Sequence, residues 1–194
     1  MSNRPTRYAG LAAAMLAMIL ITACAPQLGD SEADLALEDI ASGYADSRLK
    51  AQTPTPSRQS VRYRADRRQY RGDLYLSPAG VLAGIVLAPG VVPAGKDDPR
   101  LVALAYTLAR LRFAVLVPDL AGLRRLQVRR SDVREVAVGF AYLLSRPVLV
   151  PGGRAGIAGF SYGAGTVLLA GLEPDIRAQV RFILALGGYY DLSS

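Results

Sequence analysis

From residue 61 onward, apolar residues occur in patterns that are typical of strands. Residues 61–64 and 72–76 alternate apolar and polar side chains around a polar stretch, which predicts an antiparallel hairpin with one half-buried face. Four later segments are short and mostly apolar, at residues 84–88, 113–117, 154–159 and 180–186. Such runs are typical of strands that are buried on both faces of a mostly parallel sheet.

The segments between these runs carry helix signals. Asp97 or Asp98 is placed to cap a helix that has Pro99 in its first turn, and Ser131 is placed to cap a second helix. A third helix is predicted over residues 162–172. Because strands and helices alternate, we expect the α/β class, with an open, mostly parallel sheet, flanking helices and an N-terminal antiparallel hairpin.

The N-terminus has the pattern of an export signal. Arg4 and Arg7 precede an uncharged apolar run over residues 11–21, which is shorter than the roughly 20 residues that a membrane-spanning helix needs. The run ends in Ile-Thr-Ala before Cys24, which resembles the lipobox of bacterial lipoproteins. The resemblance implies that Cys24 is lipidated and becomes the mature N-terminus; a buried free cysteine is the alternative.

This resemblance also implies a location. An exported protein with a lipid on Cys24 is anchored to a bacterial membrane on the periplasmic side, and the outer membrane is favoured because Ala25 is not acidic. The lipid anchor would make the membrane a partner of the protein.

A spacer is predicted after the signal. Residues 25–46 hold six acidic residues and no basic one, and their apolar residues are too sparse for a convincing core helix, although a frayed surface helix is compatible with them. Pro54 and Pro56 favour extended, solvated backbone. We therefore expect a signal peptide over residues 1–23, a flexible tether over 24–57 and a partial α/β domain over 58–194.

Composition excludes several classes of protein. The chain has 194 residues, of which 51% are hydrophobic, so it can bury a core. One cysteine and no histidine exclude a disulfide framework and Cys/His metal sites, and we expect neither a metal nor an organic cofactor. The net charge of +7 comes mainly from scattered arginines rather than a basic stripe, so we do not expect nucleic-acid binding.

The candidate chemistry lies at Ser161. Gly159, Phe160, Ser161, Tyr162 and Gly163 form the motif G-x-S-x-G between a predicted buried strand and a predicted helix. A sharp turn at this position raises the serine above the edge of the sheet and brings strand and helix so close that both glycines are needed. The alternative is a glycine-rich helix start without chemistry.

Through this motif and its setting, residues 61–191 resemble the α/β-hydrolase family, in particular its serine esterases and dienelactone-hydrolase-like members. The resemblance implies that Ser161 is the nucleophile, forms an acyl-enzyme and acts on a small ester-like substrate. It also implies an oxyanion hole made by the N–H of Tyr162 and a second N–H from the loop after residue 88. Pro89 has no N–H, so the second donor is Gly90 or Val91.

The remainder of a catalytic triad is missing from the sequence. The family's order is Ser, then Asp or Glu, then His, and no histidine follows Ser161. Asp191 has the position of a triad acid in some members, but a turn aspartate is at least as good an interpretation. Lys50 and Lys96 are the only amines and lie near no motif, which disfavours a Ser–Lys pair. We therefore expect a C-terminally incomplete hydrolase sheet.

Three hypotheses remain. The first is a lipid-anchored serine hydrolase represented by the N-terminal portion of a longer gene. The second is a noncatalytic lipoprotein, a pseudoenzyme that uses a truncated hydrolase sheet for binding or structure. The third is a fragment that does not fold stably because an open sheet edge is exposed. The first hypothesis best explains a strained serine turn, which is costly without chemistry.

Overall fold

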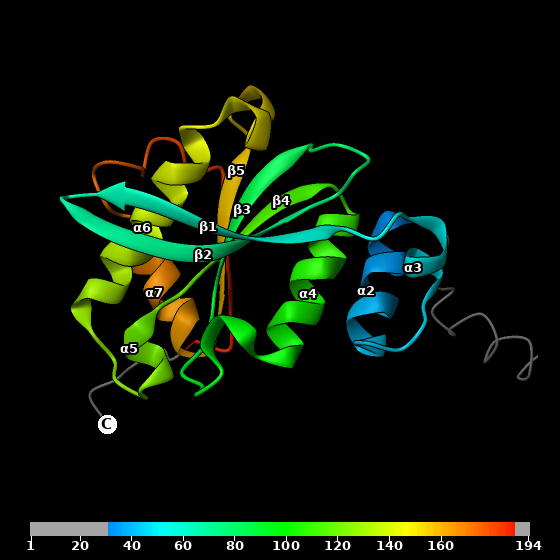
Figure 1. Ribbon diagram of the computed structural model, residues 1–194, viewed down its shortest axis with the longest axis horizontal. Coiled ribbons are helices and arrows are strands. Elements are labelled where there is room, and N and C mark those ends of the chain that lie inside the picture. The colour runs from blue at the N-terminus through cyan, green and yellow to red at the C-terminus, as the bar shows by residue number, and fades with distance from the viewer. Residues whose placement is uncertain (1–30, 189–194) are drawn as a thin grey trace, which may run out of the picture. The chain divides into compact units, whose positions relative to one another are not determined.

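The computed structural model describes residues 31–188 (Figure 1). Cys24 and Asp191 lie outside the described residues, as do the predicted signal peptide and its lipobox. The chain divides into two compact units, Met1–Asp34 and Leu35–Ser194, and the fold is that of the second unit. Within the described part of the chain, no helix combines the length and apolar character needed to cross a membrane.

Six strands form a single mixed sheet. They are β1 (Ser57–Ala65), β2 (Arg68–Leu76), β3 (Ala83–Ala88), β4 (Phe113–Pro118), β5 (Ala155–Phe160) and β6 (Phe182–Leu186). The order across the sheet is β1-β2-β4-β3-β5-β6. The strands from β4 to β6 are parallel, whereas β2 is antiparallel to both β1 and β4. The predicted α/β class, the mostly parallel sheet and the N-terminal hairpin are confirmed.

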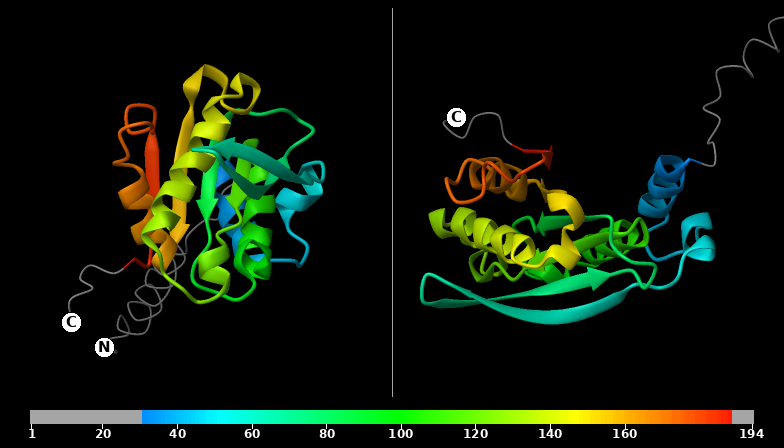
Figure 2. Two further views of the ribbon diagram at one scale, coloured as in Figure 1. Left: turned by 60° about the vertical axis from the view of Figure 1, so that its left-hand side comes forward. Right: turned by 90° about the horizontal axis from the view of Figure 1, so that it is seen from above.

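Helices cover both faces of this sheet (Figure 2). On one face, α4 (Pro99–Arg110) packs against Ile85 and Leu87 of β3. On the other face, α6 (Arg130–Leu144) and α7 (Tyr162–Ala170) pack against Val86 and Ala88. Alternate residues of one strand therefore enter opposite cores, as expected for a strand buried on both faces. A short helix, α5 (Ala121–Arg124), follows β4.

One helix cap was predicted correctly and one was not. Asp98 caps α4 by accepting hydrogen bonds from the N–H groups of Arg100 and Leu101. Ser131 is not a cap, because it lies inside α6. The cap residue is Arg129, whose N–H donates to the carboxylate of Asp132 at 2.9 Å. A carboxylate at the third helical position can reach back to the cap residue, and this bond places the start of the helix.

The described part of the expected tether is folded. Residues 32–52 form α2 (Glu32–Ser42) and α3 (Arg48–Gln52). Leu35, Leu49 and the carboxylate of Asp39 are buried. Asp39 explains the difference from the sequence interpretation, because its charge is held by Lys50 and by a hydrogen bond from Thr107 of α4 rather than by water.

Candidate active site

Ser161 occupies a sharp turn between β5 and α7. Its backbone has φ 52° and ψ −125°, and a positive φ is rare for a residue other than glycine. Its N–H donates to the carbonyl oxygen of Leu186 in β6 at 2.9 Å, and its own carbonyl accepts from the N–H of Ala164 at 2.9 Å. The serine is therefore held by the neighbouring strand on one side and by the first turn of α7 on the other.

The two glycines of the motif allow strand and helix to approach closely. A Cβ atom on Gly159 would lie 2.3 Å from the carbonyl oxygen of Gly163. A Cβ atom on Gly163 would lie 2.7 Å from the carbonyl oxygen of Pro89, in the loop after β3. Both distances are too short for real contacts with backbone atoms. The two glycines thus bring β5, α7 and the loop after β3 together around Ser161.

The loop after β3 lies beside the serine. A Cβ atom on Gly90 would be 3.7 Å from Cβ of Ser161, and Gly90 and Val91 line the same pocket as Ser161. Within residues 31–188, the N–H groups of Tyr162 and Val91 donate to no acceptor. Tyr162 is the first residue of α7, and N–H groups at a helix N-terminus favour negative charge. These groups are suited to an oxyanion.

A pocket of about 510 Å³ adjoins Ser161. Its lining includes Ile40 of α2, Val91 after β3, Leu101 and Leu104 of α4, and Phe160 of β5. Pockets of this size and apolar character are typical sites for small organic molecules. The sequence did not indicate that the segment before β1 contributes to this pocket, since no motif marks Ile40.

A buried carboxyl group contacts the residue after the serine. The hydroxyl of Tyr162 donates to Oδ2 of Asp132 at 3.5 Å, while Oδ1 of Asp132 has no partner among the described residues. Burial raises the pKa of Asp132; burial and the charge of Asp132 raise that of Glu135. Sequence reasoning missed this pair; the only signal was an acid in the first turn of a helix. Asp132 contacts Tyr162 rather than Ser161, and it precedes the serine in the chain.

Neither lysine is available to activate Ser161. The ammonium group of Lys50 binds Asp39 at 2.6 Å and two backbone carbonyls. Lys96 binds Asp73 at 2.9 Å and also contacts Asp97. Burial would lower the pKa of Lys96, but its hydrogen bonds to these two carboxylates raise it overall, so the amine stays protonated. In the region that the structure covers, no three acidic, cysteine or histidine side chains form a metal site.

Comparisons with known proteins give structural matches only. No family model matches the chain, and no curated protein matches it. A dienelactone hydrolase-like promiscuous phosphotriesterase from metagenomic libraries has a TM-score of 0.55 and 21% identity, over 70% of this chain and 60% of that one. Dienelactone hydrolase from Anabaena variabilis has a TM-score of 0.56 and 24% identity, over 70% and 65%.

A variant of the esterase rPPE has a TM-score of 0.55 and 14% identity, over 93% of this chain and 57% of that one. The chain therefore spans between 57% and 65% of the length of these three structures. The six-stranded mixed sheet, the helices on both of its faces and the likeness to these proteins show that the chain has the α/β-hydrolase fold.

Proposed function

We propose that this protein is a serine hydrolase of the carboxylic ester class and that Ser161 forms an acyl-enzyme. The observation that carries the proposal is the backbone of Ser161, because a φ of 52° costs about 1–3 kcal/mol and such strain gathers at functional sites. The pocket beside the serine supplies room for a substrate. The esterase and dienelactone hydrolase names of the similar structures point to the same reaction class.

In the proposed reaction, Oγ of Ser161 attacks the carbonyl carbon of an ester while a general base takes the hydroxyl proton. The N–H of Tyr162 and that of Gly90 or Val91 stabilise the negative charge that develops on the carbonyl oxygen. The C–O bond to the alcohol then breaks, and the alcohol leaves with the proton. Water, deprotonated by the same base, attacks the acyl group and releases the acid and Ser161.

The general base of this proposal lies outside the 194 residues. The sequence has no histidine, and both lysines are held in ion pairs. The proposal therefore includes a chain that stops before the residue carrying the base, with Asp191 as the candidate acid. The edge strand β6 supports this, because its carbonyl at Leu186 already binds Ser161, and a parallel strand added to β6 would end at the same edge of the sheet.

A noncatalytic binding protein is the second candidate. It is favoured by one observation, the absence of histidine, since imidazole is the commonest general base. Sequencing the coding DNA beyond the codon for Ser194 separates the two candidates. A continuation with an acid and then a histidine after further strands would support the hydrolase. A verified stop followed by unrelated sequence would contradict it and favour the pseudoenzyme.

The serine itself is tested in the extended protein by Ser161→Ala, with hydrolysis of p-nitrophenyl esters as the measurement. We expect the rate to fall about 10⁴-fold or to background, because the nucleophile is removed. Ser145→Ala is the matched control, since the Ser145 hydroxyl only donates to the carbonyl of Tyr142 at the end of α6. Activity that survives Ser161→Ala would overturn the assignment.

We also propose that Cys24 carries a lipid that anchors the exported protein to a bacterial membrane. The support is the sequence pattern alone: two arginines, an uncharged apolar run and small residues before the only cysteine. Cys24→Ser should release the protein from the membrane fraction on cell fractionation. If the variant stays with the membranes, an uncleaved N-terminal helix explains the association better than lipidation does.

A further inference from the structure

We infer that α2 is part of the substrate site: it forms a fixed wall of the Ser161 pocket, and the pocket binds an apolar acyl chain whose length is limited by Ile40. The inference deepens the proposed hydrolase function and rests on it. It assigns a role to residues 35–52 that the sequence had placed in a spacer.

The lining of the pocket favours an uncharged, apolar group. Most of its side chains are apolar, and its only charged side chains, Asp98 and Arg100, pair with each other at 3.0 Å. No unpaired charge in the lining is therefore available to a charged acyl group. The pocket holds about 510 Å³, and at about 30 Å³ for a water-sized group it has room for about 17 such groups. A medium-length acyl chain fits this space.

The buried carboxylate of Asp39 joins α2 to α3 by an ion pair and to α4 by a hydrogen bond. The carboxylate of Asp39 is 1% exposed and accepts hydrogen bonds from Thr107 of α4 at 2.5 Å and from Lys50 of α3 at 2.6 Å. Ser47 also donates to it. Burial would raise the pKa of Asp39, but these hydrogen bonds lower it overall, so the group stays ionised at neutral pH.

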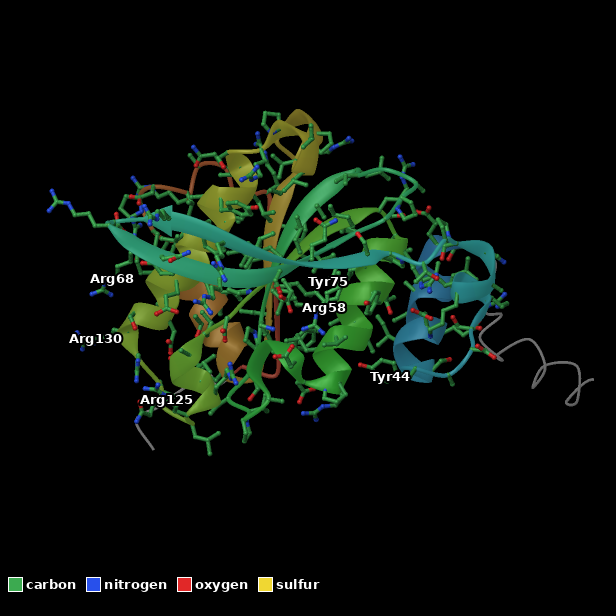
Figure 3. All side chains as sticks on the ribbon, viewed as in Figure 1. Tyr44, Arg58, Arg68, Tyr75, Arg125 and Arg130 are labelled. Atoms are coloured by element: carbon green, nitrogen blue, oxygen red, sulfur yellow. The ribbon has the colours of Figure 1, made fainter. Side chains whose placement is uncertain are left out.

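A second contact holds the connection after α2. The hydroxyl of Tyr44 donates to the carbonyl of Pro99 at the start of α4, at 2.8 Å (Figure 3). Gly43, which has a φ of 58°, lies between α2 and Tyr44 and also lines the pocket. Releasing α2 from α4 would break the hydrogen bonds of Thr107 to Asp39 and of Tyr44 to Pro99, and it would expose the buried side chain of Leu35. The wall is therefore a fixed part of the site.

Ile40 and Leu37 provide a matched pair on α2. Both are large apolar side chains, exposed at 47% and 62%, but only Ile40 lines the pocket. An apolar ligand in the pocket would cover Ile40 and would leave Leu37 in water. A change at Ile40 should therefore alter binding, whereas the same change at Leu37 should not.

The test measures binding without turnover. In the Ser161→Ala protein, sodium octanoate, a product analogue, is titrated by calorimetry, and the methyl groups of Ile, Leu and Val are followed by NMR. We expect shifts at Ile40, Val91 and Leu104 and weaker binding of butanoate. Ile40→Ser should weaken octanoate binding about tenfold through the lost apolar contact, and Leu37→Ser less than twofold. Thermal unfolding checks that both variants are folded.

Equal effects of the two serine variants would overturn the inference. So would octanoate shifts confined to methyl groups of β6. In the extended protein, Ile40→Trp should fill the pocket and shift the preference from octanoyl to acetyl esters; an unchanged preference would contradict the inference while leaving the hydrolase proposal intact. Octanoate binding at Ile40 without any ester hydrolysis in the extended protein would contradict the hydrolase proposal alone.

Discussion

The two edge strands of the sheet, β1 and β6, differ in the kind of side chain that they expose to solvent. In β1, Val61, Tyr63 and Ala65 face the core of α6, and the alternate positions carry exposed polar residues such as Arg62 and Arg64. In β6, apolar residues on both faces are exposed: Phe182 at 39%, Ile183 at 38%, Leu184 at 45% and Leu186 at 46%. Leu168 and Leu169 of α7, and Leu172 just after this helix, are also exposed.

The comparison shows that β6 has the composition of an interior strand. Charged residues on an edge strand discourage pairing with other chains, and β1 follows this rule. The strand β6 lacks charged residues and resembles β3, β4 and β5, which are buried on both faces. Exposed apolar surfaces of this kind are typical of interaction sites and of edges that are prone to aggregate. Ser161 lies on the β6 side of the sheet, so the strained turn and the uncovered edge belong to the same region.

The largest expected effect is at the turn beside β6. Gly159→Ala places a methyl group 2.3 Å from the carbonyl oxygen of Gly163, so β5 and α7 must separate. We expect the free energy of unfolding to fall by about 3 kcal/mol, measured by urea denaturation. The control is Gly165→Ala in α7, where no atom lies within 4 Å of the added methyl group. This control should be neutral or stabilising by up to about 1 kcal/mol; equal losses in the two variants would contradict the packing argument.

A smaller loss of stability is expected in the hairpin of β1 and β2, where a buried carboxylate forms ion pairs with two cations. Asp73 of β2 is 1% exposed and binds Arg58 of β1 and Lys96, while Arg58 also covers the ring of Tyr75 (Figure 3). Asp73→Asn should lower the free energy of unfolding by about 2 kcal/mol, because both cations lose their buried partner.

The same cluster makes a prediction about pH. Burial would raise the pKa of Asp73, but hydrogen bonds from Lys96, Arg58 and Ser60 lower it overall. A group with a lowered pKa in the folded state stabilises the fold above its unfolded pKa of about 3.9, and this contribution is lost as pH falls through the folded value. Stability should therefore decrease below about pH 4, and Asp73→Asn should flatten that decrease. An unchanged acid limb in Asp73→Asn would show that other carboxylates cause it.

Substitutions in β6 itself should have the smallest effect on stability and a clear effect on self-association of the protein. Replacing Ile183 and Leu184 by threonine makes this edge resemble β1 and should change the free energy of unfolding by less than about 1 kcal/mol, since both side chains are already partly exposed. Self-association, measured by sedimentation velocity, should decrease. Arg62→Ile in β1 is the reverse change and should increase it. If neither variant alters association, the comparison of the two edges has no consequence in solution.

The sequence was sufficient to predict those strands and turns whose residue pattern lies within one short stretch of the chain. Short apolar runs identified β3 to β6, and the glycines around Ser161 identified the turn that the structure places at the strand end. The order of the strands was not predictable, because the pairing of β2 with β4 joins segments far apart in the chain. The helix α2 was expected at most as a frayed surface helix within a flexible tether. Its packing was not predictable, because the sequence does not show that the fold brings Lys50 and Thr107 to the carboxylate of Asp39.

The hydrogen bond from the Ser161 amide to Leu186 links the proposed nucleophile to β6, the edge strand whose apolar side chains are exposed to solvent. Strands at an uncovered edge open locally more often than central ones, and each opening of β6 exposes this amide to solvent. The rate of amide hydrogen exchange at Ser161 therefore reports how firmly β6 is held. Polypeptide that packs over β6 would slow this exchange and steady the serine backbone at the same time.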